Sequence, residues 1–338
     1  MKKIFIRSPY FIQVNEANQL GSKVELYLYK SSEPISILPT YVLSKKAATT
    51  TQLENTYNIA NYAKEYINPI KTYTTTSPEE ENEEIWVYCT VKRYTELTLG
   101  VYSLLSTETF VCLNGYTDYT GGYNNSETTT VLPLFNTSIK KYVKDYTTAY
   151  VNVFLEPGGY DTDDGINVNS FNVFEASVYK ILISSNSILL SKDGIGTALE
   201  IKAEQLCEPK YTPITCTFIN RFGGWEFLTF FKANLQSIET TNKDFNLLPS
   251  SVNYNVFQGQ KRTFNQQGKQ KIKCNTGWVD ENYFDLIQDL LMSEVVLLNN
   301  KPVIVKSTSS DYKTHLKDRN INYEIEFEYN YGLINDVI

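Results

Sequence analysis

The sequence predicts a mainly β protein. The chain holds 26 tyrosines and 17 phenylalanines in 338 residues, but only two methionines and one histidine. Aromatic and β-branched side chains favour a pleated, half-buried surface. Short runs of these residues also recur between turn-forming residues, which is typical of a β-sandwich. We therefore expect an N-terminal β-sandwich-like region, followed by a β-rich C-terminal domain with one amphipathic helix.

The first expected domain covers residues 1–160. Its strands are predicted where apolar and polar residues alternate between turn signals. One helix is expected over residues 58–67, where apolar residues recur at helical spacing before Pro69. The acidic run at 79–84 is interpreted as a solvated hairpin tip, and 121–130 and 158–167 as loops. The expected strands are 2–14, 23–30, 40–46, 85–94, 100–106, 109–116 and 150–156.

A β-rich connecting segment is expected at 161–205, and the C-terminal domain at 206–338. Strands are predicted at 211–220, 225–238, 301–309 and 322–331. A helix is expected near 280–294, with Asp280 as its N-cap and an apolar stripe on one face. In the last strand, Glu324, Glu326 and Glu328 alternate with apolar residues, so the glutamate face either meets water or a basic partner.

No motif in the sequence indicates catalysis or a metal site. His315, the one histidine, lies in a polar loop, and the five cysteines lack the spacing of a zinc site. Phosphate-binding and nucleophile-elbow motifs are absent. The segment 160–167 has the wrong spacing for a calcium loop and is interpreted as an acidic turn. We expect no enzymatic activity, no cofactor and no bound metal.

The sequence also lacks a long apolar segment. The N-terminal apolar run spans only residues 4–6 before Arg7, which is too short for a signal peptide. A membrane-spanning helix needs about 18 apolar residues, and none occurs. We expect a soluble protein made in the cytoplasm, with reduced cysteines.

The segment CTFINRFGGWEFLTFFK, residues 216–232, has the composition of a sharp turn between two aromatic-rich strands. Gly223 and Gly224 allow the chain to reverse, and Trp225 begins the returning strand. Asn220 and Arg221 are expected to pair with backbone groups of the turn or to reach a neighbour. We interpret the segment as a hairpin corner with an aromatic anchor.

A basic tract follows, with no acidic residue between Phe245 and Val279. One interpretation is a long hairpin with a cationic end. The other is an arm that contacts an acidic partner, and a neighbouring subunit is favoured over DNA passing nearby because the tract is diffuse and poor in arginine. Its basic residues are Lys261, Arg262, Lys269, Lys271 and Lys273.

Three segments in the C-terminal region resemble virion tail proteins of phages that infect Bacteroidetes, including crAss-like phages. They are FINRFGGWEFLTFFK, then TGWVDENYFDLIQDLLMSEVVLLNNKPVIVKSTSSDYKT, then INYEIEFEYNY, and they cover roughly residues 206–332. The N-terminal strands are similar to the β-sandwich of the same proteins. The matching residues are Asn220, Arg221, Gly223, Trp225, Trp278, Pro302, Val303, Ile304, Val305, Lys313, Asn322 and Tyr323.

The resemblance implies a structural tail protein whose motif residues determine the fold or the interface, without catalytic residues. It implies a homo-oligomeric ring of roughly six or twelve copies that contacts other tail or portal-proximal proteins, with DNA as a further partner if it passes through the lumen. The expected location is the virion tail, assembled in the host cytoplasm. Two alternatives stay open: a glycan- or receptor-binding β-sandwich module with exposed aromatics, and a hydrolase that uses two unmarked carboxylates.

Overall fold

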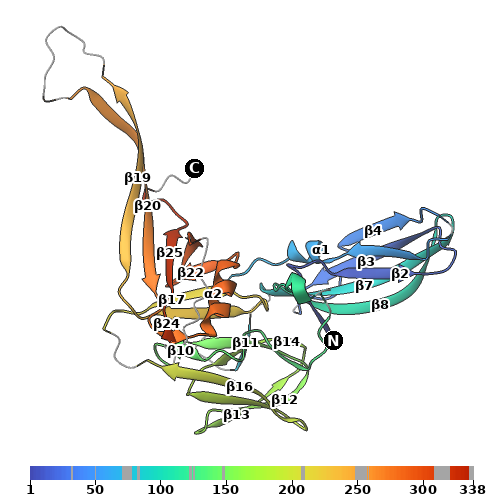
Figure 1. The fold of residues 1–338 in the computed structure, drawn as a ribbon. Coiled ribbons are helices and arrows are strands. Elements are labelled where there is room, and N and C mark those ends of the chain that lie inside the picture. The colour runs from blue at the N-terminus through green and yellow to red at the C-terminus, as the bar shows by residue number, and fades with distance from the viewer. Residues whose placement is uncertain are drawn as a thin grey trace. The chain divides into compact units, whose positions relative to one another are not determined.

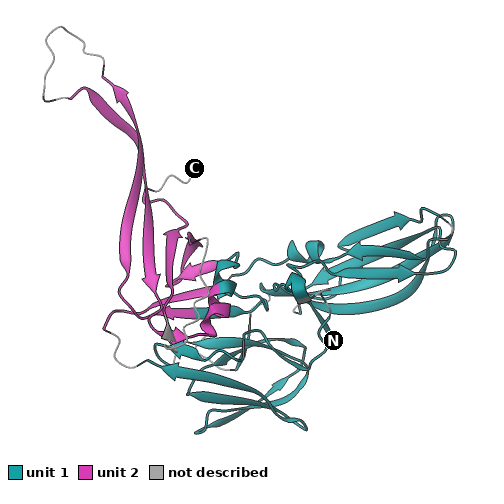
Figure 2. Ribbon diagram, viewed as in Figure 1, with its two compact units in different colours: residues 1–207, 218–227, 288–295 teal, residues 208–217, 228–287, 296–338 magenta. Residues whose placement is uncertain are grey.

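The computed structural model describes the chain except for residues 32, 50, 71–77, 82–83, 122–123, 125, 147–148, 207–209, 248–256, 258, 308–319 and 335–338. It confirms the mainly β class, since strands in several sheets make up most of its elements (Figure 1). The chain divides into two compact units that are interleaved in sequence (Figure 2). Unit 1 comprises 1–207, 218–227 and 288–295, and unit 2 comprises 208–217, 228–287 and 296–338.

The N-terminal part of unit 1 is sandwich-like. A five-stranded sheet with the order β1-β8-β7-β3-β4 shares its core with the two-stranded β2–β5 ribbon and α1. Side chains alternate between the two faces of β3, and Val24, Leu26 and Leu28 pack into that core. The elements are β1 (Lys2–Phe5), β2 (Phe11–Asn15), β3 (Gly21–Tyr29), β4 (Tyr41–Lys46), β5 (Glu54–Asn58), α1 (Ala60–Lys64), β7 (Trp86–Thr98) and β8 (Val101–Leu113).

The rest of unit 1 is built from two further sheets around a second core. Their strand orders are β10-β16-β15-β12-β13 and β6-β14-β11-β9. Every residue of β11 is buried, and all but Asn152 are aromatic or aliphatic, as expected for a buried strand. The elements are β6 (Glu79–Glu80), a 3₁₀ turn η1 (Tyr119–Gly121), β9 (Val131–Pro133), β10 (Lys141–Val143), β11 (Tyr150–Leu155), β12 (Gly158–Asp163), β13 (Val168–Val173), β14 (Ser177–Leu182), β15 (Ser187–Lys192) and β16 (Gly196–Gln205).

The C-terminal strands form a seven-stranded sheet with the order β18-β17-β22-β23-β25-β20-β19. The boundary between the units runs through β17, β18 and α2. The elements are β17 (Ile214–Ile219), β18 (Trp225–Phe230), β19 (Leu235–Asn246), β20 (Lys261–Asn275), β21 (Val279–Asp280), α2 (Tyr283–Leu291), β22 (Val296–Leu298), β23 (Lys301–Val305), β24 (Asn320–Ile321) and β25 (Glu324–Tyr329).

Several local predictions differ from the structure. Both helices are shorter than expected, and Asp280 cannot be the N-cap of α2 because it belongs to β21. The predicted strands 100–106 and 109–116 are one strand, β8, whereas the predicted strand 225–238 breaks into β18 and β19. Sequence periodicity locates strands, but cross-strand pairing decides where each one ends.

Two predicted loops are also partly strand. The segment 158–167 contains β12, which pairs with β13 and β15, so the expected domain division at 160 and 161 falls inside a strand. The acidic run begins with β6, which pairs with β14, and Glu81 is buried rather than solvated. Glu81 tolerates burial because the ammonium of Lys180 lies 3.6 Å from its carboxylate.

Candidate functional site

The corner between β17 and β18 is a tight turn whose backbone only glycine accommodates. Gly223 has φ +83°, and a Cβ there would lie 2.7 Å from the backbone nitrogen of Asn114. The turn is closed by hydrogen bonds from the Gly223 N–H to the Asn220 carbonyl and from the Asn220 N–H to the Gly224 carbonyl. This geometry agrees with the predicted hairpin corner, and it requires glycine at 223.

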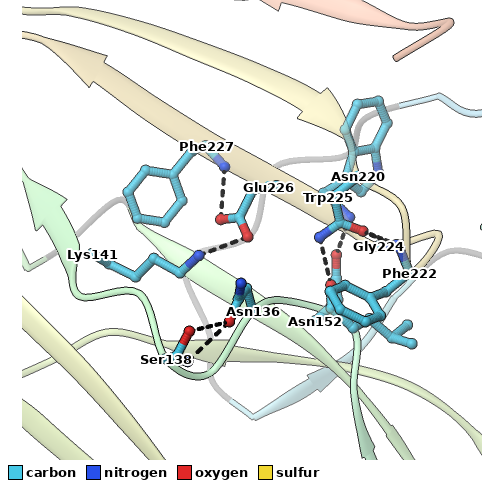
Figure 3. A network of polar contacts seen from close by, with 11 residues as sticks. Asn136, Ser138, Lys141, Asn152, Asn220, Phe222, Gly224, Trp225, Glu226 and Phe227 are labelled. Atoms are coloured by element: carbon cyan, nitrogen blue, oxygen red, sulfur yellow. Dashed lines mark hydrogen bonds and ion pairs between the residues drawn. The ribbon is translucent and has the colours of Figure 1, made fainter. Parts of the chain in front are cut away.

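The side chain of Asn220 organises the corner from inside (Figure 3). Its Oδ1 accepts hydrogen bonds from the N–H groups of Phe222 (2.9 Å) and Gly224 (3.2 Å), and its Nδ2 donates to the Leu134 carbonyl at 2.7 Å. Asn220 is buried, and its contacts with Gly224 and Leu134 satisfy buried backbone groups. Asn220 thus pairs with backbone groups of the turn, which is one of the two roles expected for it.

A second asparagine anchors the returning strand. Asn152, from β11, accepts a hydrogen bond from the Trp225 N–H at 2.7 Å (Figure 3). Its Nδ2 donates to the carboxylate of Glu81 at 3.0 Å. The indole of Trp225 is only 2% exposed. Trp225 thus acts as the expected aromatic anchor, whereas sequence reasoning missed Asn152, because nothing local marks a residue that meets its partner 73 positions away.

A buried ion pair adjoins the corner. The ammonium of Lys141 lies 2.7 Å from the carboxylate of Glu226, and both side chains are almost fully buried (Figure 3). The other carboxylate oxygen of Glu226 accepts the Phe227 N–H at 3.1 Å. Removing one partner of a buried pair of this kind is strongly destabilising, because the other charge is left buried without compensation.

Arg221 lies at the outer side of the corner. Its guanidinium stacks over the Phe222 ring at 4.9 Å and lies 3.9 Å from the carboxylate of Asp118. Its backbone N–H donates to Asp289, which also accepts a hydrogen bond of 3.4 Å from the Tyr116 hydroxyl. Burial raises the pKa of Asp289 to about 7, against the opposing effect of Arg221.

Unit 2 carries a long two-stranded hairpin, β19–β20 (Figures 1 and 2). All twelve residues of β19 are exposed, and β19 is the last strand of its sheet, with no described strand on its outer side. Ile238 is 63% exposed, and Leu235, Phe245 and Phe264 are exposed as well. The hairpin is regular except for one bulge, where Asn265 adopts φ +51°.

The basic residues near the base of the hairpin are paired within the chain. Lys269 lies 3.1 Å and Lys306 3.3 Å from the carboxylate of Glu328, and Lys273 pairs with Glu324. Burial disfavours the charge on Glu328, but the two lysines outweigh it and lower the pKa of that carboxyl. The glutamate face of β25 therefore meets a basic strand of its own chain, the alternative that the sequence left open.

The positive charges in the rest of the basic tract have fewer ion-pair partners. Lys271 pairs with Glu239 across the hairpin at 2.5 Å. Lys261 and Arg262 lie at the far end of β20, opposite Asn246 and Phe245, and both are exposed. Only these two of the five predicted arm residues present a charge without an ion-pair partner among the described residues.

Trp278 differs from the buried Trp225 because its indole is 64% exposed. It lies beside Tyr211 in a groove of about 650 Å³ at the base of the hairpin. Of the other motif residues, Tyr323 is buried, Asn322 lines the same groove and Pro302 to Val305 form most of β23. Lys313 and His315 lie outside the described residues.

Within the described ranges, no three histidine, cysteine, aspartate or glutamate side chains are placed to hold a metal ion. Asp164, in the predicted acidic turn, accepts hydrogen bonds from the N–H groups of Ile166 and Asn167 and so stabilises the β12–β13 turn. Across the part of the chain that is described, no helix is long and apolar enough to cross a membrane.

Compared with known proteins, the chain matches no protein-family model and no curated sequence.

Proposed function

We propose that the protein is a structural component of a phage tail and assembles as a homo-oligomeric ring through its β19–β20 hairpin. The observation that carries the proposal is the outer edge of β19, twelve exposed residues long and unpaired among the described strands. The tail-protein motifs around residues 220–225 and 322–329 support the class of protein.

An open strand edge of this length is a template for another chain. Its N–H and C=O groups can pair with a neighbour's strand, and natural proteins block such edges with prolines, lysines or bulges unless the edge is used. β19 has no proline, and its blocking features are one lysine, Lys243, and one bulge between Thr241 and Lys243. A head-to-tail contact of this kind, repeated between identical copies, closes into a ring when the rotation permits.

The side chains of the hairpin suit the same role. Four apolar side chains of the hairpin are exposed in the single chain and would be buried by contact with a neighbouring copy. They are Leu235, Ile238, Phe245 and Phe264. Apolar surface contributes about 25 cal/mol per Å² on burial, which is the main drive for association. The paired lysines leave little net charge at the base of the hairpin, so a protein partner suits this surface better than DNA.

Native mass spectrometry tests the proposal. The wild-type protein should assemble to a mass that is a multiple of 38.8 kDa. Ile238→Lys places a charge on the edge strand and should shift the protein to the monomer. Ile166→Lys, at a still more exposed apolar position in the β12–β13 turn, serves as the control and should assemble normally.

Two results would reject the proposed function. One is a wild-type chain that stays monomeric at all concentrations, alone and with other tail proteins. The other is an Ile238→Lys variant that assembles as well as the control.

A further inference from the structure

Trp278 is the exposed tryptophan of the chain. Trp86 is 0% and Trp225 2% exposed, whereas Trp278 is 64% exposed. Its neighbours in sequence, Gly277 and Val279, are both buried. The loop therefore holds one large aromatic side chain outward while the residues on either side pack inward.

The loop that carries Trp278 is held in place by buried hydrogen bonds. The Thr276 N–H donates to the Tyr323 carbonyl at 2.9 Å, and the Thr276 hydroxyl accepts the Tyr323 N–H at 3.0 Å. Asn275 Oδ1 accepts the Gly277 N–H at 2.8 Å, and Gly277 has φ +76°. An aromatic ring on a fixed backbone loses little conformational entropy when a ligand binds.

The groove around Trp278 is lined by both aromatic and polar residues. Tyr211, 39% exposed, lines the same groove of about 650 Å³. The polar lining residues are Lys232, Asn234, Lys273, Asn275, Asn322 and Glu324. Asparagine and glutamate supply acceptors, and asparagine and lysine supply donors, so the groove can bind a ligand rich in hydroxyl groups.

We propose that this groove binds a saccharide, with a pyranose ring stacked on the indole of Trp278. A pyranose presents an apolar face of C–H groups that fits an aromatic ring, and hydroxyl groups around its edge that fit amides and carboxylates. The rigid indole of Trp278 would contact the apolar face of the sugar, and the polar residues of the groove would bind its hydroxyl groups. The site lies wholly within unit 2 and does not depend on the proposed ring.

The charges of the groove favour a saccharide over the alternatives. Lys273 and Glu324 form an ion pair in the groove, so little net charge remains to attract nucleic acid. The core of a protein interface is depleted in charged side chains, whereas two lysines and a glutamate line this groove. A neutral, hydroxyl-rich ligand fits both observations.

The test is binding of the full-length protein to an array of α- and β-linked pyranose oligosaccharides, followed by calorimetry with the best binder. Wild-type protein should bind at least one saccharide saturably. Trp278→Ala should weaken binding about tenfold or more, and Trp278→Phe should retain most of it because a flat ring remains. Phe174→Ala removes an exposed aromatic of unit 1 and is the matched control.

Intrinsic fluorescence gives an independent reading. Because the other two tryptophans are buried, a bound saccharide should shift the emission of Trp278 and protect it from acrylamide quenching. The proposal is overturned if no saccharide on the array binds, or if Trp278→Ala binds as tightly as Phe174→Ala. It is also overturned if Trp278→Ala abolishes self-association while saccharide affinity is unchanged, since the groove would then be a protein contact.

Discussion

Replacing Asn220 by alanine should cost this protein a large share of its stability. The substitution removes three hydrogen bonds that the side chain makes to Phe222, Gly224 and Leu134. The Gly224 N–H and the Leu134 carbonyl would then be left buried without these partners. Each such group costs about 1–3 kcal/mol, so we expect a loss of about 3–4 kcal/mol in the free energy of unfolding of unit 1.

The assay is equilibrium unfolding in urea, followed by the fluorescence of the buried tryptophans Trp86 and Trp225, which both belong to unit 1. Asn61→Ala, at an exposed position in α1, is the matched control and should change stability by less than about 0.5 kcal/mol. A loss below about 1 kcal/mol for Asn220→Ala would refute the view that this side chain organises the corner.

The chemistry of Asn220 allows a second variant. Asn220→Asp keeps acceptors for the Phe222 and Gly224 N–H groups but loses the donor that faces the Leu134 carbonyl at 2.7 Å. The new carboxyl, buried beside a carbonyl oxygen, should have a raised pKa in the folded state. Its stability should therefore be nearest to wild type at low pH and fall as pH rises above about 4.

Further predictions concern the same region. Gly223→Ala should cost more than about 1 kcal/mol in urea unfolding, because φ is +83° and the new Cβ would lie 2.7 Å from the Asn114 nitrogen. Lys141→Met should lower the free energy of unfolding by about 3–5 kcal/mol, because it leaves Glu226 buried without its cation. Adding Glu226→Leu should restore much of that loss, and equal losses in the single and double variants would contradict the pairing. The folded-state pKa of Asp289, about 7, lies above its unfolded value of about 3.9, so it contributes stability that is present below pH 4 and lost as pH rises to 7. Asp289→Asn should flatten that decline in a thermal unfolding series, and an unchanged pH profile would contradict it.

The sequence predicted local features of the fold well. Alternation located β25 and correctly placed Ile325 and Phe327 on its buried side. The two glycines and Trp225 identified the corner, because turn chemistry and a large aromatic are visible within six residues. These features depend on residues that are neighbours along the chain, so the local order of residue types is enough to predict them.

Contacts between distant residues could not be predicted in the same way. The partners of the β25 glutamates come from β20 and from Lys306, just after β23, and their pairing depends on the register between strands up to 59 residues apart. Asn152 and Lys141 carry no signal of their own, since a single asparagine or lysine in a strand is usually exposed. The exposure of Trp278 likewise depends on how Thr276 and Tyr323 fix its loop.

Hydrogen–deuterium exchange of the β19 backbone, compared between the assembled protein and its dissociated monomer, tests the central claim most directly. If β19 pairs with a neighbouring copy, its amides that face away from β20 should exchange rapidly in the monomer and slowly in the assembly. Rapid exchange of those amides in an assembled particle would contradict the account, because the copies would then be held together by another surface.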